Sequence, residues 1–335
     1  MITLEKLNIT IKTKLMNNYR RLEGLIAATF TPMYNNGDIN YSVIKEYAQH
    51  IVDSNISGVF VCGTTGEFSS LTIEERKLIL EQWVKAAKGQ FKVIVHVGSD
   101  NLRDAILLAH HAAEVDADGI GCISPSFFKP GSVNDLISFF VPIATAAPEL
   151  PFYYYNMPSM TGVNLSVAEF LHEGKRKIPN LAGVKFTHND LMEMGDCIQL
   201  DDGAFEVLHG FDETLITGLT LGAIAGVGST YNYAPNVYLN CIKAMEKREI
   251  KVAREFQMQS IEIVKVIIKY GGGVRGGKAI MNLIGIECGD CRLPIAPFEK
   301  SEYDSLKKDI EEFGFLKRRQ TSPVNNILNI RHYIE

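Results

Sequence analysis

Eight short apolar runs, separated by longer amphipathic stretches, constrain the fold of this chain more than any other feature. The runs cover residues 25–30, 58–63, 92–97, 119–124, 151–156, 181–186, 205–210 and 223–229. They are rich in β-branched and aromatic residues and lack a polar alternate face, which is typical of strands buried on both sides of a parallel sheet. A helical pattern follows each run, and the one over 72–88 begins with Thr72 and Glu75 in capping-box spacing.

Eight β/α units in one uninterrupted series predict an α/β fold of the (β/α)8 TIM barrel type. The alternative is a doubly wound sheet, which usually stops at about five to seven strands and has a glycine-rich dinucleotide turn. The pairs Gly119/Gly121 and Gly226/Gly228 lack the third glycine of that turn. We therefore expect an N-terminal extension over 1–21, a barrel over 22–248, additional C-terminal helices over 249–316 and a tail over 317–335.

The composition is that of a soluble globular protein, with 46% hydrophobic and 22% charged residues and a formal net charge of -5. This balance gives no indication of a nucleic-acid partner. No apolar run approaches the roughly 18 residues of a membrane helix, and the N-terminus lacks the apolar core and cleavage site of a signal peptide. The six cysteines are scattered, as expected for reduced thiols. We expect a cytoplasmic protein without membrane contact.

Two motifs resemble ligand sites but lack essential residues. Cys288 and Cys291 have metal-like spacing, yet no second cysteine pair or histidine pair accompanies them, so a plain loop is expected there. Residues 272–278 have the spacing of a phosphate-binding loop, but Ala279 stands where Ser or Thr would hold magnesium. We interpret this run as a flexible connection between helices. The sequence thus predicts no metal and no cofactor.

Lys185 lies in the apolar run 181–186, which is predicted to be a buried strand. A long cationic side chain is disfavoured inside a sheet unless a partner, a substrate or chemistry justifies it. Burial favours the neutral amine, which can attack a carbonyl and form a Schiff base. Lys185 is therefore the candidate nucleophile.

The active site of such a barrel lies at the C-terminal ends of its strands. The second predicted strand ends in Gly-Thr-Thr-Gly-Glu over 63–67, where Thr64 and Thr65 can hold a small carboxylate; the alternative is an ordinary tight turn. The fifth ends after Tyr155, which shares a face with Tyr153 while Tyr154 takes the other. Tyr155 is the candidate proton relay, although tyrosines in strands often serve packing alone.

The last two predicted strands end in groups that suit a polyhydroxylated substrate. These candidate binding residues are Gly210, Asp212 and Glu213 after the seventh strand and Ser229 after the eighth. The alternative for either carboxylate is that it caps the following helix. His96 and His209 lie within predicted strands, where a hydrogen-bonded core histidine is expected rather than a metal ligand.

Four motifs together make the chain, from about residue 22 to 315, resemble the N-acetylneuraminate lyase branch of the dihydrodipicolinate synthase superfamily. They are Gly-Thr-Thr-Gly-Glu over 63–67, Tyr-Asn-Met-Pro over 155–158 with Gly162, Gly-Val-Lys-Phe-Thr over 183–187, and Gly-Ser-Thr-Tyr-Asn over 228–232. The resemblance implies a class I aldolase in which Lys185 forms the imine, Thr64 and Thr65 hold the substrate carboxylate, and Tyr155 relays a proton.

The branch assignment depends on fewer residues. Residues 210–213 and Ser229 match lyase positions that contact the glycerol tail of sialic acid, and Thr187 matches the residue near the reacting hydroxyl. Met160 replaces the arginine that serves the second substrate in the synthase branch. Phe127 stands where many bacterial relatives place a second relay tyrosine from a neighbouring subunit, so it is not expected to be catalytic.

The resemblance implies reversible cleavage of N-acetylneuraminate to pyruvate and N-acetyl-D-mannosamine by a homotetramer that binds small molecules and no nucleic acid. One alternative keeps the imine and changes the substrate to another 2-keto-3-deoxy sugar acid. A second alternative is a non-catalytic sensor that binds pyruvate or sialic acid. Such a sensor would be expected to lose Lys185 or Tyr155, and both are present.

Overall fold

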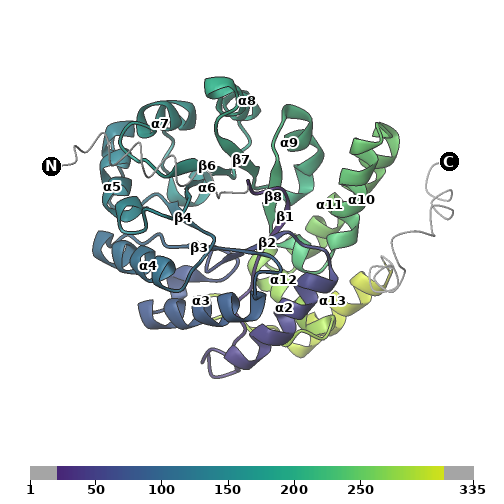
Figure 1. Cartoon of the computed structure of the whole chain (residues 1–335). Coiled ribbons are helices and arrows are strands. Elements are labelled where there is room, and N and C mark those ends of the chain that lie inside the picture. The colour runs from purple at the N-terminus through teal and green to yellow at the C-terminus, as the bar shows by residue number, and fades with distance from the viewer. Residues whose placement is uncertain (1–20, 313–335) are drawn as a thin grey trace.

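Eight parallel strands form a closed barrel in the computed structural model, which describes residues 21–312 (Figure 1). The strands are β1 (Gly24–Ala28), β2 (Gly58–Val61), β3 (Lys92–His96), β4 (Gly119–Ile123), β5 (Phe152–Asn156), β6 (Leu181–Phe186), β7 (Glu206–His209) and β8 (Ala225–Gly228). They follow one another in chain order around the ring, and β1 pairs with β8 to close it. The predicted (β/α)8 barrel is confirmed.

Helices surround the ring and cover its outer face (Figure 1). They are α2 (Ile44–Asp53), α3 (Ile73–Ala87), α4 (Leu102–Glu114), α5 (Val133–Thr145), α6 (Pro158–Thr161), α7 (Val167–Gly174), α8 (Leu191–Gln199), α9 (Leu215–Leu221) and α10 (Pro235–Glu246). Short 3-10 turns include η1 (Tyr41–Val43), η2 (Phe68–Ser70), η3 (Leu200–Asp202), η4 (Asp212–Thr214) and η5 (Thr230–Asn232). The predicted capping box of α3 is present: Thr72 Oγ1 accepts from the Glu75 N–H, and the Glu75 carboxylate accepts from the Thr72 N–H at 2.8 Å.

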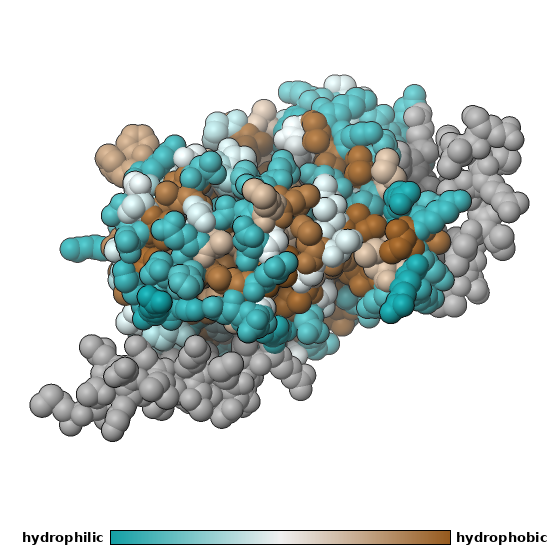
Figure 2. Space-filling model, turned by 90° about the horizontal axis from the view of Figure 1, so that it is seen from above, coloured by the Kyte–Doolittle hydropathy of each residue, from teal (hydrophilic) through white to brown (hydrophobic). Residues whose placement is uncertain are grey.

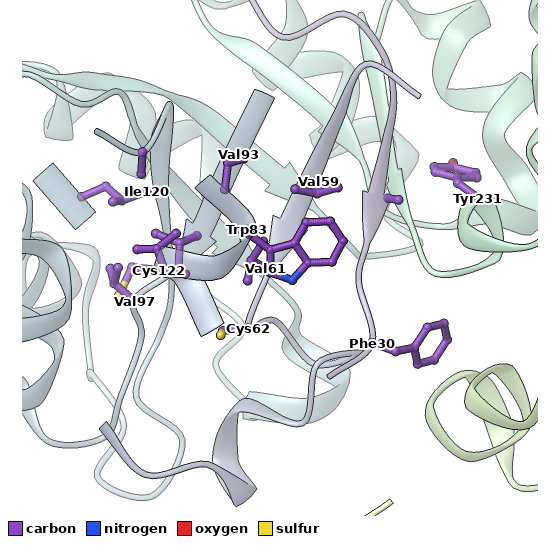
Figure 3. Packing of buried hydrophobic residues seen from close by; sticks show 14 of the residues in the cluster. Phe30, Val59, Val61, Cys62, Trp83, Val93, Val97, Ile120, Cys122 and Tyr231 are labelled. Atoms are coloured by element: carbon purple, nitrogen blue, oxygen red, sulfur yellow. The ribbon is translucent and has the colours of Figure 1, made fainter. Parts of the chain in front are cut away.

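Strand side chains alternate between two hydrophobic clusters. Tyr153 and Tyr155 belong to the cluster inside the barrel, whereas Tyr154 belongs to the larger cluster between strands and helices, as the alternation predicted. Trp83 of α3 is fully buried in that outer cluster, beside Val59 and Val61 of β2 (Figure 3). The outer cluster therefore holds the helices against the ring, and side chains on the inner face of the strands point into the barrel.

The C-terminal region adds α11 (Ile250–Lys269), α12 (Gly272–Leu283) and α13 (Lys300–Glu312), which lie together on one side of the barrel (Figure 1). The expected flexible connection over 272–278 is wrong, because these residues form the first turns of α12. The glycines there permit close packing. A Cβ atom added at Gly276 would lie 2.8 Å from the Ile267 carbonyl oxygen, and one at Gly277 would lie 2.7 Å from the Phe30 ring.

Cys288 and Cys291 lie in an irregular segment between α12 and α13, as predicted. Within residues 21–312, no helix is long and apolar enough to cross a membrane. One face of the molecule, in Figure 2, carries interspersed hydrophilic and hydrophobic residues. The predicted tail over 317–335, and the predicted N-terminal extension apart from Arg21, lie outside the described residues.

Candidate active site

Lys185 projects from β6 into the barrel interior. Its side chain is buried, with a residue exposure of 5%. Its Nζ lies 3.8 Å from the centre of the Tyr155 ring and 4.6 Å from that of Phe60. None of the ion pairs among residues 21–312 involves Lys185. This amine thus lies against two aromatic faces and forms no ion pair with a described carboxylate.

A bulge in β6 turns Lys185 toward the interior. Phe152 of β5 pairs with Leu181, but the next residue, Tyr153, pairs with Gly183, so β6 contains one extra residue at this point. Beyond the bulge, Lys185 pairs with the inward-facing Tyr155. Without the extra residue, Lys185 would pair with the following position of β5 and face the helices, because a slip of one residue exchanges the two faces of a strand.

Glycine is required at this bulge. A Cβ atom added at Gly183 would lie 1.9 Å from the carbonyl oxygen of Glu206 in β7. No side chain fits at that distance, so the close approach of β6 and β7 depends on Gly183.

The hydroxyl of Tyr155 lies beside the turn that follows β2. Its Oη is 3.1 Å from Thr64 Oγ1 and 3.1 Å from Met157 Sδ. The edges of Phe60 and His96 surround the phenol ring, with ring centres 5.7 and 5.9 Å away. Lys185, Tyr155 and Thr64, from three different strand ends, are therefore brought together.

The turn over 63–67 has the features of an anion cradle. Thr65 is buried, and the N–H groups of Thr64 and Thr65 form no hydrogen bond with other described residues. The N–H of Glu67 closes the turn on the Thr64 carbonyl at 3.0 Å, and Thr31 Oγ1 donates to the Gly66 carbonyl at 2.8 Å. Two free N–H groups beside two hydroxyls suit a carboxylate.

Asp212 is held by the turn after β8. Its Oδ2 accepts from the N–H of Thr230 at 2.8 Å and from Thr230 Oγ1 at 2.6 Å. Burial raises the pKa of Asp212 to about 6, against the opposing effect of these hydrogen bonds. The capping alternative for Asp212 and Glu213 is wrong, because the N-cap of α9 is Thr214 and the first-turn N–H of Ile216 donates to Gln257 Oε1 at 2.7 Å.

Thr187 and Gly210 lie against each other at the ends of β6 and β7. A Cβ atom added at Gly210 would be 2.0 Å from Thr187 Oγ1. This hydroxyl is buried without a partner among the described residues, and such a group is costly unless a ligand satisfies it. Glu213 and Ser229 are half-buried near the same ends, with Ser229 facing α12, where its Oγ would lie 3.4 Å from a Cβ atom added at Gly273.

The sequence predicted His96 and His209 to be core residues, but it did not predict which groups contact them. Both are fully buried, and burial lowers the pKa of each; for His209 the value falls to about 4. The buried Arg76 of α3 also lowers the pKa of His96 and donates to the carbonyls of His96 and Gly98 at 2.6 and 2.9 Å. Burial and Arg76 thus favour the neutral imidazole of His96, which lies edge-on to the Tyr155 ring.

A second group that sequence reasoning did not find is a buried ion pair. Lys278 Nζ of α12 donates to Glu67 Oε1 at 2.7 Å, and both side chains are 1% exposed. The available signal was a lysine followed by Ala-Ile-Met in an apolar stretch, the same signal that identified Lys185.

Comparison with known proteins agrees with the motif resemblance. The N-acetylneuraminate lyase of Mus musculus is 44% identical over 301 residues, which cover 89% of this chain and 94% of the mouse protein. The solved N-acetylneuraminate lyase (sialic acid aldolase) of Aliivibrio salmonicida has a TM-score of 0.87 at 40% identity and covers 90% of this chain and 99% of its own. The solved N-acetylneuraminate lyase of Proteus mirabilis has a TM-score of 0.86 at 36% identity, and the match covers 88% of this chain and 100% of the Proteus mirabilis chain.

The match extends over all of the described residues. The family model for the dihydrodipicolinate synthetase family covers residues 21–313, which include all eight strands and the three C-terminal helices. The resemblance inferred from four short motifs is thereby confirmed over the whole barrel, and the chain belongs to the dihydrodipicolinate synthetase family.

Proposed function

We propose that this protein is an N-acetylneuraminate lyase, which reversibly cleaves N-acetylneuraminate to pyruvate and N-acetyl-D-mannosamine. The observation that carries the proposal is the buried contact between Lys185 and the Tyr155 ring. The Tyr155 hydroxyl is in turn hydrogen-bonded to the Thr64 hydroxyl. Relatives at 44% and 40% identity carry the same activity in their names, which supports this substrate.

Lys185 is the nucleophile of the proposed mechanism. Its amine attacks the C2 carbonyl of the open-chain sugar acid, and loss of water gives a protonated imine. Tyr155 gives its phenol proton to the departing water and, as the phenolate, then takes the proton of the C4 hydroxyl. The bond from C3 to C4 breaks, and its electrons pass into the imine as an enamine. N-acetyl-D-mannosamine leaves as the aldehyde. Tyr155 then passes this proton to C3 of the enamine. Hydrolysis of the resulting protonated imine by water releases pyruvate and the free amine and returns a proton to Tyr155.

The remaining site residues hold the substrate in this proposal. Thr64 and Thr65 bind the carboxylate next to C2 through their hydroxyls and free N–H groups. The unpartnered hydroxyl of Thr187 contacts the reacting hydroxyl, in the space that Gly210 leaves. The polyol tail extends toward Asp212, Glu213 and Ser229. Lys185 acts as both nucleophile and electron sink, so the steps require no cofactor.

The test is reductive trapping with pyruvate and borohydride, followed by peptide mapping. Trapping should attach a stable adduct to the Lys185 peptide, and Lys185→Met should lose the adduct and at least about a thousandfold in turnover. Lys265→Met, which changes an exposed lysine of α11, is the control and should retain both. Retained turnover in Lys185→Met would refute the mechanism.

A substrate panel separates the alternatives. Pyruvate release should be fastest from N-acetylneuraminate and slow from 2-keto-3-deoxy sugar acids without the nine-carbon tail. Faster release from the shorter acids would assign the second aldolase function instead. Pyruvate binding without turnover on any member of the panel would indicate a sensor.

We further propose a cytoplasmic homotetramer. The six free thiols support a reducing compartment. The neighbouring rings of Phe127 and Phe128 after β4 are 79% and 86% exposed, which supports coverage by another subunit. Light scattering should give four times the monomer mass, and Phe127→Ser with Phe128→Ser should reduce it.

A further inference from the structure

Glu67 and Lys278 form an ion pair that the proposed mechanism does not use. The two residues are 211 positions apart in the sequence and meet at 2.7 Å with 1% of each side chain exposed. Burying two charges is costly, and replacing such a pair with apolar residues is often neutral or stabilising. A contribution to stability alone is therefore a weak explanation for it.

Both oxygens of the Glu67 carboxylate are bound by the C-terminal region. Oε1 accepts from Lys278 of α12, and Oε2 accepts from the N–H of Arg292 at 2.9 Å. Glu67 also has a positive φ of 58°, a left-handed conformation that is unfavourable for a residue with a side chain. Two bonds to one carboxylate hold the backbone in this conformation.

The backbone that Glu67 fixes is the carboxylate cradle. The Glu67 N–H closes the turn on the Thr64 carbonyl at 3.0 Å, and the Thr64 hydroxyl lies 3.1 Å from the Tyr155 hydroxyl. A continuous series of contacts therefore runs from Lys278 through Glu67 and Thr64 to Tyr155. Gly277 makes this possible, because a Cβ atom there would meet the Phe30 ring at 2.7 Å and push α12 away from the turn.

We propose that the Glu67–Lys278 pair is a positioning device that orients the Thr64–Thr65 turn toward the carboxylate of the keto acid, so that α12 sets the affinity for pyruvate. The inference rests on the proposed function. Neither residue touches substrate; both act through the turn. Lys278 is held by a carboxylate, whereas Lys185 faces aromatic rings, so only Lys185 is the nucleophile.

The test compares two carbonyl compounds that differ in the group the turn would bind. Borohydride trapping at Lys185 is measured with pyruvate, which has a carboxylate, and with acetone, which lacks one. The main variant is the double change Glu67→Gln with Lys278→Met, because either single change leaves a charge buried alone. We expect the half-saturating pyruvate concentration to rise at least tenfold, while trapping with acetone changes less than threefold.

The control is a second ion pair on the same helix. Arg275 of α12 pairs with Glu302 at 2.7 Å, and the hydrogen bonds of this pair within the described part of the chain go to residues 270, 296, 297 and 299, not to the 63–67 turn. Arg275→Met with Glu302→Gln should leave trapping by both compounds unchanged. Lys278→Arg, which keeps the charge, should restore most of the pyruvate affinity when Glu67 is intact.

The outcomes are distinct. Selective loss of pyruvate trapping supports the positioning role, since partial unfolding would reduce both adducts equally. An equal reduction, or no reduction, overturns the inference and leaves the proposed function standing. If the double variant does not fold, Glu67→Asp, which keeps the charge but shortens the side chain, replaces it in the same comparison. Absence of a pyruvate adduct in the unmodified protein would overturn the proposed function as well.

Discussion

Lys185 and Lys278 are the two buried lysines among residues 21–312, and their partners give them different roles. Lys185 contacts the rings of Tyr155 and Phe60, while Lys278 is paired with Glu67. The local sequence does not reveal the partner of a buried lysine, because the partner of Lys278 is 211 positions away. Lys185 could be identified from sequence because it lies in an apolar run predicted to be a buried strand. Lys278 ends a glycine-rich run whose sequence predicts a flexible connection.

Asp212 should make stability depend on pH in the acidic range. Its pKa is raised from 3.8 to about 6 in the folded state, so the folded protein binds the proton more tightly than the unfolded chain does. The stability from this group is therefore fully present below about pH 4 and is lost as pH rises through about 6. His209, whose pKa is lowered to about 4, acts in the opposite direction over the same range.

Asp212→Asn removes this contribution and leaves that of His209. The free energy of unfolding of the unmodified protein minus that of the variant should therefore increase by about 2 to 3 kcal/mol between pH 7 and pH 4, since each pKa unit corresponds to about 1.4 kcal/mol. Urea denaturation at several pH values measures the difference. Parallel pH profiles would show that Asp212 does not titrate as described.

At the scale of elements, the strand pattern was predictable and the bulge was not. Continuous apolar runs located all eight strands to within a residue or two, because burial on both faces leaves little room for polar residues. Gly183 was the only sequence signal for the bulge, since a glycine inside a strand often marks one. Its meaning depends on the Glu206 carbonyl of the next strand, which no local pattern reveals.

The misassigned connection over 272–278 has a related cause. Intrinsic propensity counts glycine as a helix breaker, at about 1 kcal/mol relative to alanine. In α12, however, Gly276 and Gly277 face the Ile267 carbonyl and the Phe30 ring at distances that exclude a side chain. Tertiary packing thus outweighs helix propensity in α12. A sequence pattern read over a few neighbouring residues cannot reveal packing partners such as Phe30.

Gly183→Ala should displace β6 and misorient Lys185. The added methyl group would overlap the Glu206 carbonyl oxygen, so we expect a loss of about 3 kcal/mol or more in stability and at least about a hundredfold in pyruvate trapping by the folded fraction. Gly195→Ala in α8 is the matched control, because nothing lies within 4 Å of the new atom. That change should be neutral or slightly stabilising. Full trapping in Gly183→Ala would contradict the role of the bulge.

At the scale of the whole molecule, one arginine fastens the C-terminal segment to the barrel. Arg292 pairs with Glu75 of α3 and donates to the carbonyl oxygens of Gly37 and Ser70 at 2.8 and 2.6 Å. Its guanidinium also lowers the pKa of Glu75. Three separate parts of the chain thus meet at a single side chain.

Arg292→Met should weaken this attachment. It removes several charge-assisted hydrogen bonds at a partly buried position, so we expect a loss of about 2 to 4 kcal/mol in denaturant unfolding. Lys300→Met removes an ion pair whose lysine side chain is 89% exposed and should change the midpoint little. Equal effects of the two changes would mean that Arg292 contributes no more than a surface pair.

The closed ring of strands determines where partial unfolding exposes strand edges. Because β1 pairs with β8, no strand offers a free row of N–H and carbonyl groups to another molecule. The shortest ladder is that between β7 and β8, where only Leu208 with Ala225 and His209 with Gly226 are in register. We expect the ring to part first at this seam, and the two edges so created to be where self-association begins.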